Sequence, residues 1–140
     1  MAVRAHERME HALVMTFNDA SMPAFSKGDE VKFDSSDTLL AETTNSDAAA
    51  IGIVVQANAA TRPASVAMYG SPAVIPVLVG TGGATRGAFA VKTTDGFTNA
   101  ATVGGGTVVQ YVRGQFLQSG VVGDTVGMMI GVNPSSVKSS

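Results

Sequence analysis

Short apolar segments separated by turn signals dominate the chain from Gly28 onward. Glycine, proline, asparagine and aspartate cluster between the segments, as in GSP, GTGGATRG and TDGFTN. Segments of about four to eight residues that are rich in strand-forming residues and bounded in this way are typical of β-strands. Sustained helical periodicity is absent outside the N-terminus. The sequence therefore predicts an all-β fold.

Seven segments have the pattern of strands. They are EVKF, AIGIVVQA, ASVAMYG, AVIPVLVG, GAFAVKTT, TVVQYVRGQF and TVGMMIGV. About seven short strands predict a small β-barrel or a β-sandwich. Because Pro76 has no N–H to donate to a ladder, AVIPVLVG is expected at a sheet edge or at a bulge.

The first 26 residues lack hairpin-type turn signals. We expect residues 1–26 to form an extended N-terminal arm and residues 27–140 to form a β-rich domain. Residues 5–13 are the candidate for a short helix within the arm. The solvated face of that helix is predicted to carry Arg4, Glu7, Arg8 and Glu10.

The arm also carries large apolar side chains, among them Met15, Phe17, Met22 and Phe25. Burying such a side chain stabilises a protein by about 1.5 to 3 kcal/mol relative to leaving it in water. We therefore expect these side chains to pack either on their own domain or on a partner.

Charge and cysteine content exclude several classes of function. The net charge is −2 and only 14% of residues are charged, which gives no basic footprint for nucleic acid or for an anionic membrane surface. The chain has no cysteine, so disulfides, thiolate metal sites and cysteine nucleophiles are excluded. No apolar run approaches the roughly 20 residues of a membrane helix, so a soluble protein is expected.

The glycine-rich segment Gly80–Gly87 lies where a phosphate-binding loop is often found. Gly82 and Gly87 have P-loop spacing, but Ala88 and Phe89 stand where Lys and Ser or Thr are needed. The dinucleotide pattern fails at Thr85, which occupies its last glycine position. We interpret the glycines as turn residues that supply positive φ between strands.

Catalytic and metal-binding patterns are also incomplete. His6 and His11 are five residues apart, whereas the zinc helix motif needs four. The chain has no nucleophile elbow of the G-x-S-x-G type. Carboxylates in turn-like contexts, which are usually exposed, are Asp29, Glu30, Asp34, Asp37, Glu42, Asp47, Asp95 and Asp124. Asp95 and Asp124 are predicted to stabilise turns. The sequence predicts no enzyme and no cofactor.

The order of motifs resembles the head decoration proteins of tailed phages, also called capsid cement proteins. A GD-V strand at Gly28 to Val31 precedes an IGV-type strand at Ile51 to Val54. A Gly-Gly hairpin then leads to a G-x-x-x-V-K segment beginning at Gly87, and the chain closes on GD-x-V followed by a final apolar strand at Gly123 to Ile130. The resemblance covers about Gly28 to Val132; the arm has no matching motif.

This resemblance implies a structural virion protein on the outer surface of an expanded phage capsid, made in the host cytoplasm. Such a protein braces the shell against the pressure of packaged DNA. Its expected partners are the major capsid protein and further copies of itself, as a homotrimer or homodimer, with no nucleic acid, membrane or cofactor. We predict that the capsid-facing contacts are Leu13, Val14, Met15, Phe17, Met22 and Phe25.

A carbohydrate-binding or adhesin-type β module displayed on the virion is the alternative. Such modules share the β architecture but normally display an exposed aromatic platform. The chain has no Trp and only two tyrosines, Tyr69 and Tyr111, which makes this alternative weaker.

Overall fold

The computed structural model describes residues 5–18, 22–35, 40–42, 49–57, 63–100, 109–131 and 135–138. Within these ranges every regular element is a β-strand, which confirms the predicted all-β class. The described residues accordingly contain no helix of the length and hydrophobicity needed to cross a membrane.

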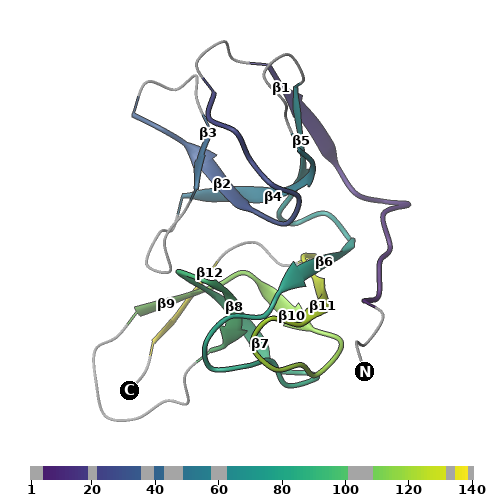
Figure 1. The fold of residues 1–140 in the computed structure, drawn as a ribbon, viewed down its shortest axis with the longest axis vertical. Helices are drawn as coiled ribbons and strands as arrows, with labels where there is room; N and C mark the ends of the chain where they lie inside the picture. Colours follow the sequence, from purple (N-terminus) through teal and green to yellow (C-terminus); the bar gives the residue numbers. More distant parts are fainter. Residues whose placement is uncertain are drawn as a thin grey trace.

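Two antiparallel five-stranded sheets and one two-stranded ladder make up the fold (Figure 1). The first sheet, in the order β1-β5-β4-β2-β3, forms the upper lobe in Figure 1. Its strands are β1 (Val14–Phe17), β2 (Glu30–Phe33), β3 (Leu40–Glu42), β4 (Ala50–Gln56) and β5 (Ala64–Met68).

The second sheet, in the order β6-β11-β10-β7-β8, lies in the lower lobe. Its strands are β6 (Val74–Leu78), β7 (Phe89–Thr93), β8 (Gly96–Asn99), β10 (Gly114–Phe116) and β11 (Thr125–Met129). The remaining two strands, β9 (Val109–Val112) and β12 (Ser135–Lys138), pair with each other. The two sheets thus follow one another along the chain, so each lobe is built largely from one half of the sequence.

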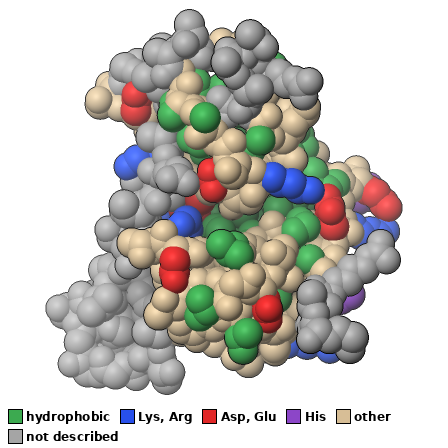
Figure 2. All heavy atoms as spheres, viewed as in Figure 1, with side chains coloured by type: hydrophobic (Ala, Val, Ile, Leu, Met, Phe, Trp, Pro, Cys, Tyr) green, Lys and Arg blue, Asp and Glu red, His purple; other side chains and the backbone are tan. Residues whose placement is uncertain are grey.

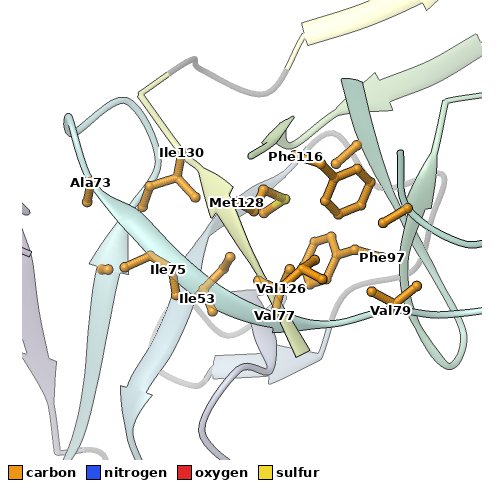
Figure 3. Packing of buried hydrophobic residues seen from close by; sticks show 13 residues of the cluster. Ile53, Ala73, Ile75, Val77, Val79, Phe97, Phe116, Val126, Met128 and Ile130 are labelled. Carbon is orange, nitrogen blue, oxygen red and sulfur yellow. The ribbon is translucent and has the colours of Figure 1, made fainter. Parts of the chain in front are cut away.

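The main hydrophobic core lies between the two sheets. Ile53 and Ala67 of the first sheet pack with buried residues of the second sheet and its connecting segments. Figure 3 shows these side chains meeting, with Met128 and Val126 of β11 between the two phenylalanine rings and the isoleucines. The labelled residues are Ile53, Ala73, Ile75, Val77, Val79, Phe97, Phe116, Val126, Met128 and Ile130. Two sheets that share a core in this way have the layering of a sandwich.

The opposite face of the first sheet buries a second, smaller core. Its buried residues are Phe25, Val31, Val54, Ala64 and Val66. Phe17 and Met22 pack against them. The Phe17 ring also meets Phe33 edge to face, with the ring centroids 5.6 Å apart. Side chains from the predicted arm therefore cover this face of the sheet.

The second sheet curls until its two edges touch. Val79, just after β6, forms a parallel bridge with Phe97 of β8, and the Gly80 N–H donates to the Phe97 carbonyl at 2.9 Å. Gly96 makes this approach feasible, because a Cβ at that position would lie 2.6 Å from the Leu78 carbonyl oxygen. A single bridge does not close the sheet, so the predicted barrel alternative is not formed.

Residues 5–13, called the strap below, cross the second sheet before β1 begins. Arg8 and Val74 exchange two backbone hydrogen bonds of 2.9 and 2.8 Å. The His6 N–H donates to Oε1 of Gln118 at 2.7 Å. The predicted short helix at residues 5–13 is therefore wrong: Arg8 bonds to the second sheet, and the backbone hydrogen bond within the segment, from the Ala12 N–H to the Met9 carbonyl at 3.0 Å, closes a single turn.

The strap depends on a glycine beneath it. A Cβ at Gly127 in β11 would lie 2.8 Å from the His6 carbonyl oxygen and 2.9 Å from its Cβ. Further along, Met9 and Ala12 pack against the main core. The strap thus joins the second sheet to β1, the edge strand of the first sheet.

Candidate interaction surface

Strand β1 forms the outer edge of the first sheet. It pairs antiparallel with β5 over four residues in unbroken register, from Val14 opposite Ala67 to Phe17 opposite Ala64. The Met68 N–H donates to the Leu13 carbonyl at 2.8 Å. Backbone groups alternate in direction along such a strand. The N–H and C=O groups of Val14 and Thr16 therefore point away from β5, and no hydrogen bond to them exists within the described residues.

The side chains at this edge are apolar and accessible. Exposure is 58% for Leu13, 42% for Val14 and 45% for Met15. Thr16 adds a hydroxyl 3.3 Å from that of Ser65. The structure therefore brings three of the six predicted partner-binding residues together at one accessible strand edge.

The other three predicted residues lie inside the fold. Phe17 and Met22 are half-buried against the second core, and Phe25 is a member of it with 5% exposure. The sequence left open whether these side chains pack on their own domain or on a partner. In the structure they pack on their own domain. The prediction that Phe25 contacts a partner is wrong, because the side chain is enclosed by its own sheet.

Within the described residues, the outer edge of β1 has none of the usual protections against strand pairing. Proteins guard sheet edges with charged residues, prolines, bulges or covering segments. Strand β1 reads VMTF and has a regular register. Edge strand β6, in contrast, contains Pro76 and is covered at Val74 by the strap. The prediction that the AVIPVLVG segment is an edge strand is confirmed.

A buried polar triad joins the two sheets. Arg113, in the break between β9 and β10, lies with Nε 2.8 Å from Oε2 of Glu30 at the start of β2, and both side chains are fully buried. The Tyr69 hydroxyl donates to the same carboxylate oxygen. Burial raises the pKa of Glu30, while the Arg113 charge and the hydrogen bonds oppose that rise. Burial and the Glu30 charge raise the pKa of Tyr69 well above its ordinary value.

Sequence reasoning missed this triad. It placed Glu30 among exposed turn carboxylates, which is wrong because the side chain is fully buried. An arginine inside an apolar strand segment, YVRGQF, was the available signal, since a buried charge requires a partner. The enclosed carboxylate and guanidinium hold the lobes together and are out of reach of a dissolved substrate. Tyr69 is likewise committed to this contact rather than to an exposed aromatic platform.

The segment Gly80–Gly87 is a structural turn between β6 and β7. Positive φ at Gly82, Gly83 and Gly87 confirms the predicted role of the glycines. Asp95 ties the turn to the β7–β8 hairpin, because its carboxylate accepts the Thr81 N–H at 3.0 Å and the hydroxyls of Thr81 and Thr93. These hydrogen bonds lower the pKa of Asp95 to about 2. The predicted turn role of Asp95 is confirmed.

The described residues do not assemble a metal centre. No group of three or more His, Asp or Glu side chains within them is close enough to hold an ion. A groove of about 450 Å³ lies between the loop before β2 and the edge of β6, lined by residues 26–29, Pro76, Leu78 and Thr125. Its charged residues, Lys27 and Asp29, have opposite signs, so the lining has no net charge to attract an ionic ligand.

The visible face of the molecule has few charges. Figure 2 shows acidic and basic side chains spread over both lobes, some of them side by side, with hydrophobic side chains between them. Contacts with a partner at such a surface rely on apolar area and backbone hydrogen bonds more than on long-range charge. Strand β1 supplies both kinds of contact and is the best candidate interaction site.

Comparison with known protein families, with curated proteins and with solved structures found no match for this chain.

Proposed function

We propose that this chain is a structural virion protein that decorates the outer surface of an expanded phage capsid and stabilises the shell against internal DNA pressure. Two independent lines support the proposal. The motif order from Gly28 to Val132 resembles that of head decoration proteins. The observation that carries it is the free, uncharged and apolar edge of β1, which is suited to a stable contact with another protein chain.

The proposed contact is strand addition. An extended segment of the major capsid protein pairs with β1 through the outward N–H and C=O groups of Val14 and Thr16. Alternate side chains of the incoming strand then lie beside Leu13, Val14 and Met15, whose exposed apolar surface is removed from water. Main-chain hydrogen bonds supply affinity in this mode, and the flanking side chains supply specificity.

Residues deeper in the arm support this edge and do not touch the partner. Phe17, the last residue of β1, and Met22 pack against the second core, and Phe25 is a buried member of it. The strap fixes the other end of β1 through the Arg8–Val74 hydrogen bonds. An edge held at both ends is preorganised, which reduces the entropy cost of binding.

Binding of this kind stabilises a shell by mass action. A ligand that binds the intact lattice but not its disrupted form stabilises each site by about 2.7 kcal/mol when its free concentration is 100 times the dissociation constant. Repetition over many sites multiplies the effect.

Co-sedimentation with expanded heads that lack the protein tests the proposal, with unexpanded shells as the comparison. We expect saturable binding to expanded heads. Val14→Lys should weaken this binding by about tenfold or more, because a charge on the edge opposes strand pairing. Leu78→Lys is the matched control, since Leu78 is 49% exposed on edge strand β6. Absence of wild-type binding to either form contradicts the proposed function.

A further inference from the structure

The turn between β10 and β11 carries two adjacent exposed valines. Val121 is 70% exposed and Val122 is 56% exposed, and Val121 is the most exposed of the large hydrophobic side chains described. Single exposed apolar residues are common on protein surfaces, whereas Val121 and Val122 are neighbours, so their side chains offer one contiguous apolar surface at the tip of the turn. The local sequence, SGVVGD, has one charged residue, Asp124.

Hydrogen bonds hold the turn in a fixed shape. The Val121 N–H donates to Oδ2 of Asp124 at 2.9 Å, and the Asp124 N–H donates back to the Val121 carbonyl at 3.0 Å. Val79 fastens the turn from outside: its carbonyl accepts from Gly123 at 2.9 Å and its N–H donates to Asp124 at 2.8 Å.

A second fastening lies just before the valines, where Gly120 and Ala84 exchange two backbone hydrogen bonds of 2.9 and 3.0 Å. The turn is therefore anchored on both sides, and its valines are kept in water instead of folding onto the core. A rigid apolar projection of this kind binds a partner at a low entropy cost.

The turn and the β1 edge belong to different sheets. Strand β1 lies in the upper lobe in Figure 1, whereas β10 and β11 lie in the lower lobe. Stable protein interfaces bury about 800 Å² on each partner and involve about 20 to 30 residues a side. The four residues of β1 provide a small part of such an interface. An additional contact is therefore needed for stable attachment.

We propose that the Val121–Val122 turn is a second shell-binding contact, which inserts into an apolar pocket on a neighbouring subunit of the same shell that β1 engages. This inference rests on the proposed function and specifies how the protein bridges subunits. The turn's only carboxylate, on Asp124, already accepts the Val121 N–H, so the turn offers apolar surface rather than a free charge to its partner. Once β1 is bound, the second contact forms at a high effective concentration, and the two contacts together give avidity.

The test is a titration of expanded heads that lack the protein with the Val121→Ser/Val122→Ser double variant. We expect an apparent dissociation constant about tenfold higher than that of the wild type, at the same number of copies bound at saturation. Thermal unfolding of the variant should match that of the wild type, because both side chains are already in water. Phe89→Ser is the matched control, since Phe89 is 53% exposed in the same sheet but lies outside the turn.

The outcomes separate this inference from the proposed function. If Val14→Lys loses binding while the double valine variant binds as the wild type does, the proposed function stands and the second contact is refuted. An equal loss of binding in Phe89→Ser also refutes it, because the effect is then a general loss of apolar surface. Failure of the wild type to bind heads overturns both proposals.

Discussion

The two sheets treat their edges in opposite ways. In the second sheet, the edge strands β6 and β8 meet through the Val79–Phe97 bridge, and the strap covers Val74. In the first sheet, β1 presents an uncharged strand without proline, and its outward backbone groups have no partner within the described residues. An unguarded edge invites aggregation. Its retention in the first sheet, while the edges of the second sheet are partly covered, supports a binding role for β1.

The two cores differ in a related way. The main core draws side chains from both sheets, whereas the second core depends on Phe25 and on the flanking Phe17 and Met22, all from the first 26 residues. The segment that presents the proposed binding edge therefore also closes the core behind it. Removing residues 1–26 would take away β1 and open this core, so point substitutions are the cleaner tests.

The buried Glu30–Arg113 pair, which joins the two sheets, should give the largest effect on stability. We expect Glu30→Gln to lower the free energy of unfolding by about 3 to 5 kcal/mol, because it leaves the Arg113 charge buried without its counter-charge. Urea unfolding measures the loss. The double variant Glu30→Met/Arg113→Met is the control, and it should recover most of the stability because neither charge remains. A loss below about 1 kcal/mol in Glu30→Gln would contradict a buried joint.

A cavity in the second core should destabilise the protein nearly as much. Phe25→Ala is expected to cost about 3 kcal/mol in the free energy of unfolding, because it leaves a cavity behind the first sheet. Met15→Ala is the comparison, since that side chain is 45% exposed and should cost far less. Equal stability of Phe25→Ala and the wild type would show that the arm is separable from the domain.

A substitution beneath the strap, which rests on the second sheet, should have an intermediate effect on the free energy of unfolding. Gly127→Val places side-chain atoms where the His6 backbone now lies, and we expect a loss of about 1 to 3 kcal/mol. Hydrogen exchange should show faster exchange at the Arg8 and Val74 amides, which lose their mutual hydrogen bonds. Unchanged protection at both amides would mean that the strap does not rest on Gly127.

The smallest expected effect on stability concerns Asp95, which ties the Gly80–Gly87 turn to the β7–β8 hairpin. This effect depends on pH. The folded protein lowers the pKa of Asp95 from 3.8 to about 2, so the ionised carboxylate contributes stability that is fully present above pH 3.8. That contribution is lost as pH falls through about 2. Asp95→Asn should therefore have a lower unfolding temperature than the wild type at pH 5, and the difference should shrink towards pH 2. A difference independent of pH would exclude the carboxylate as its source.

Periodicity and turn chemistry predicted much of the fold. All seven predicted strand segments contain strands, with TVVQYVRGQF divided at Arg113 into β9 and β10. The strands that the sequence did not predict are β1, β3, β8 and β12. Each is three or four residues long and lies in a segment with polar residues, with Gly or without turn signals. Such short segments lack the alternation that identifies longer strands. Asp95-Gly96 correctly indicated the β7–β8 hairpin.

The candidate site was predictable in composition but not in arrangement. Large apolar side chains in the first 26 residues indicated that this segment must be buried somewhere. Sequence alone does not say that Phe25 is buried while Met15 stays exposed, because burial depends on strands far along the chain: Phe25 packs with residues of β2, β4 and β5, and Met15 lies opposite Val66 at the sheet edge. The Glu30–Arg113 contact likewise joins residues that are distant in sequence, so the local signal of an arginine in an apolar segment does not say which carboxylate it meets.

One substitution tests the central claim, that the β1 edge binds the shell, most directly. Thr16→Pro removes an N–H that points away from β5, so the β1–β5 hydrogen bonds remain while an incoming strand loses one of its two donors, those of Val14 and Thr16. Thr16→Val keeps that N–H and is the matched control. In co-sedimentation with expanded heads, we predict that Thr16→Val binds as the wild type does and that Thr16→Pro, folded to the same unfolding temperature, loses binding. Full binding by a folded Thr16→Pro variant would contradict strand addition at β1.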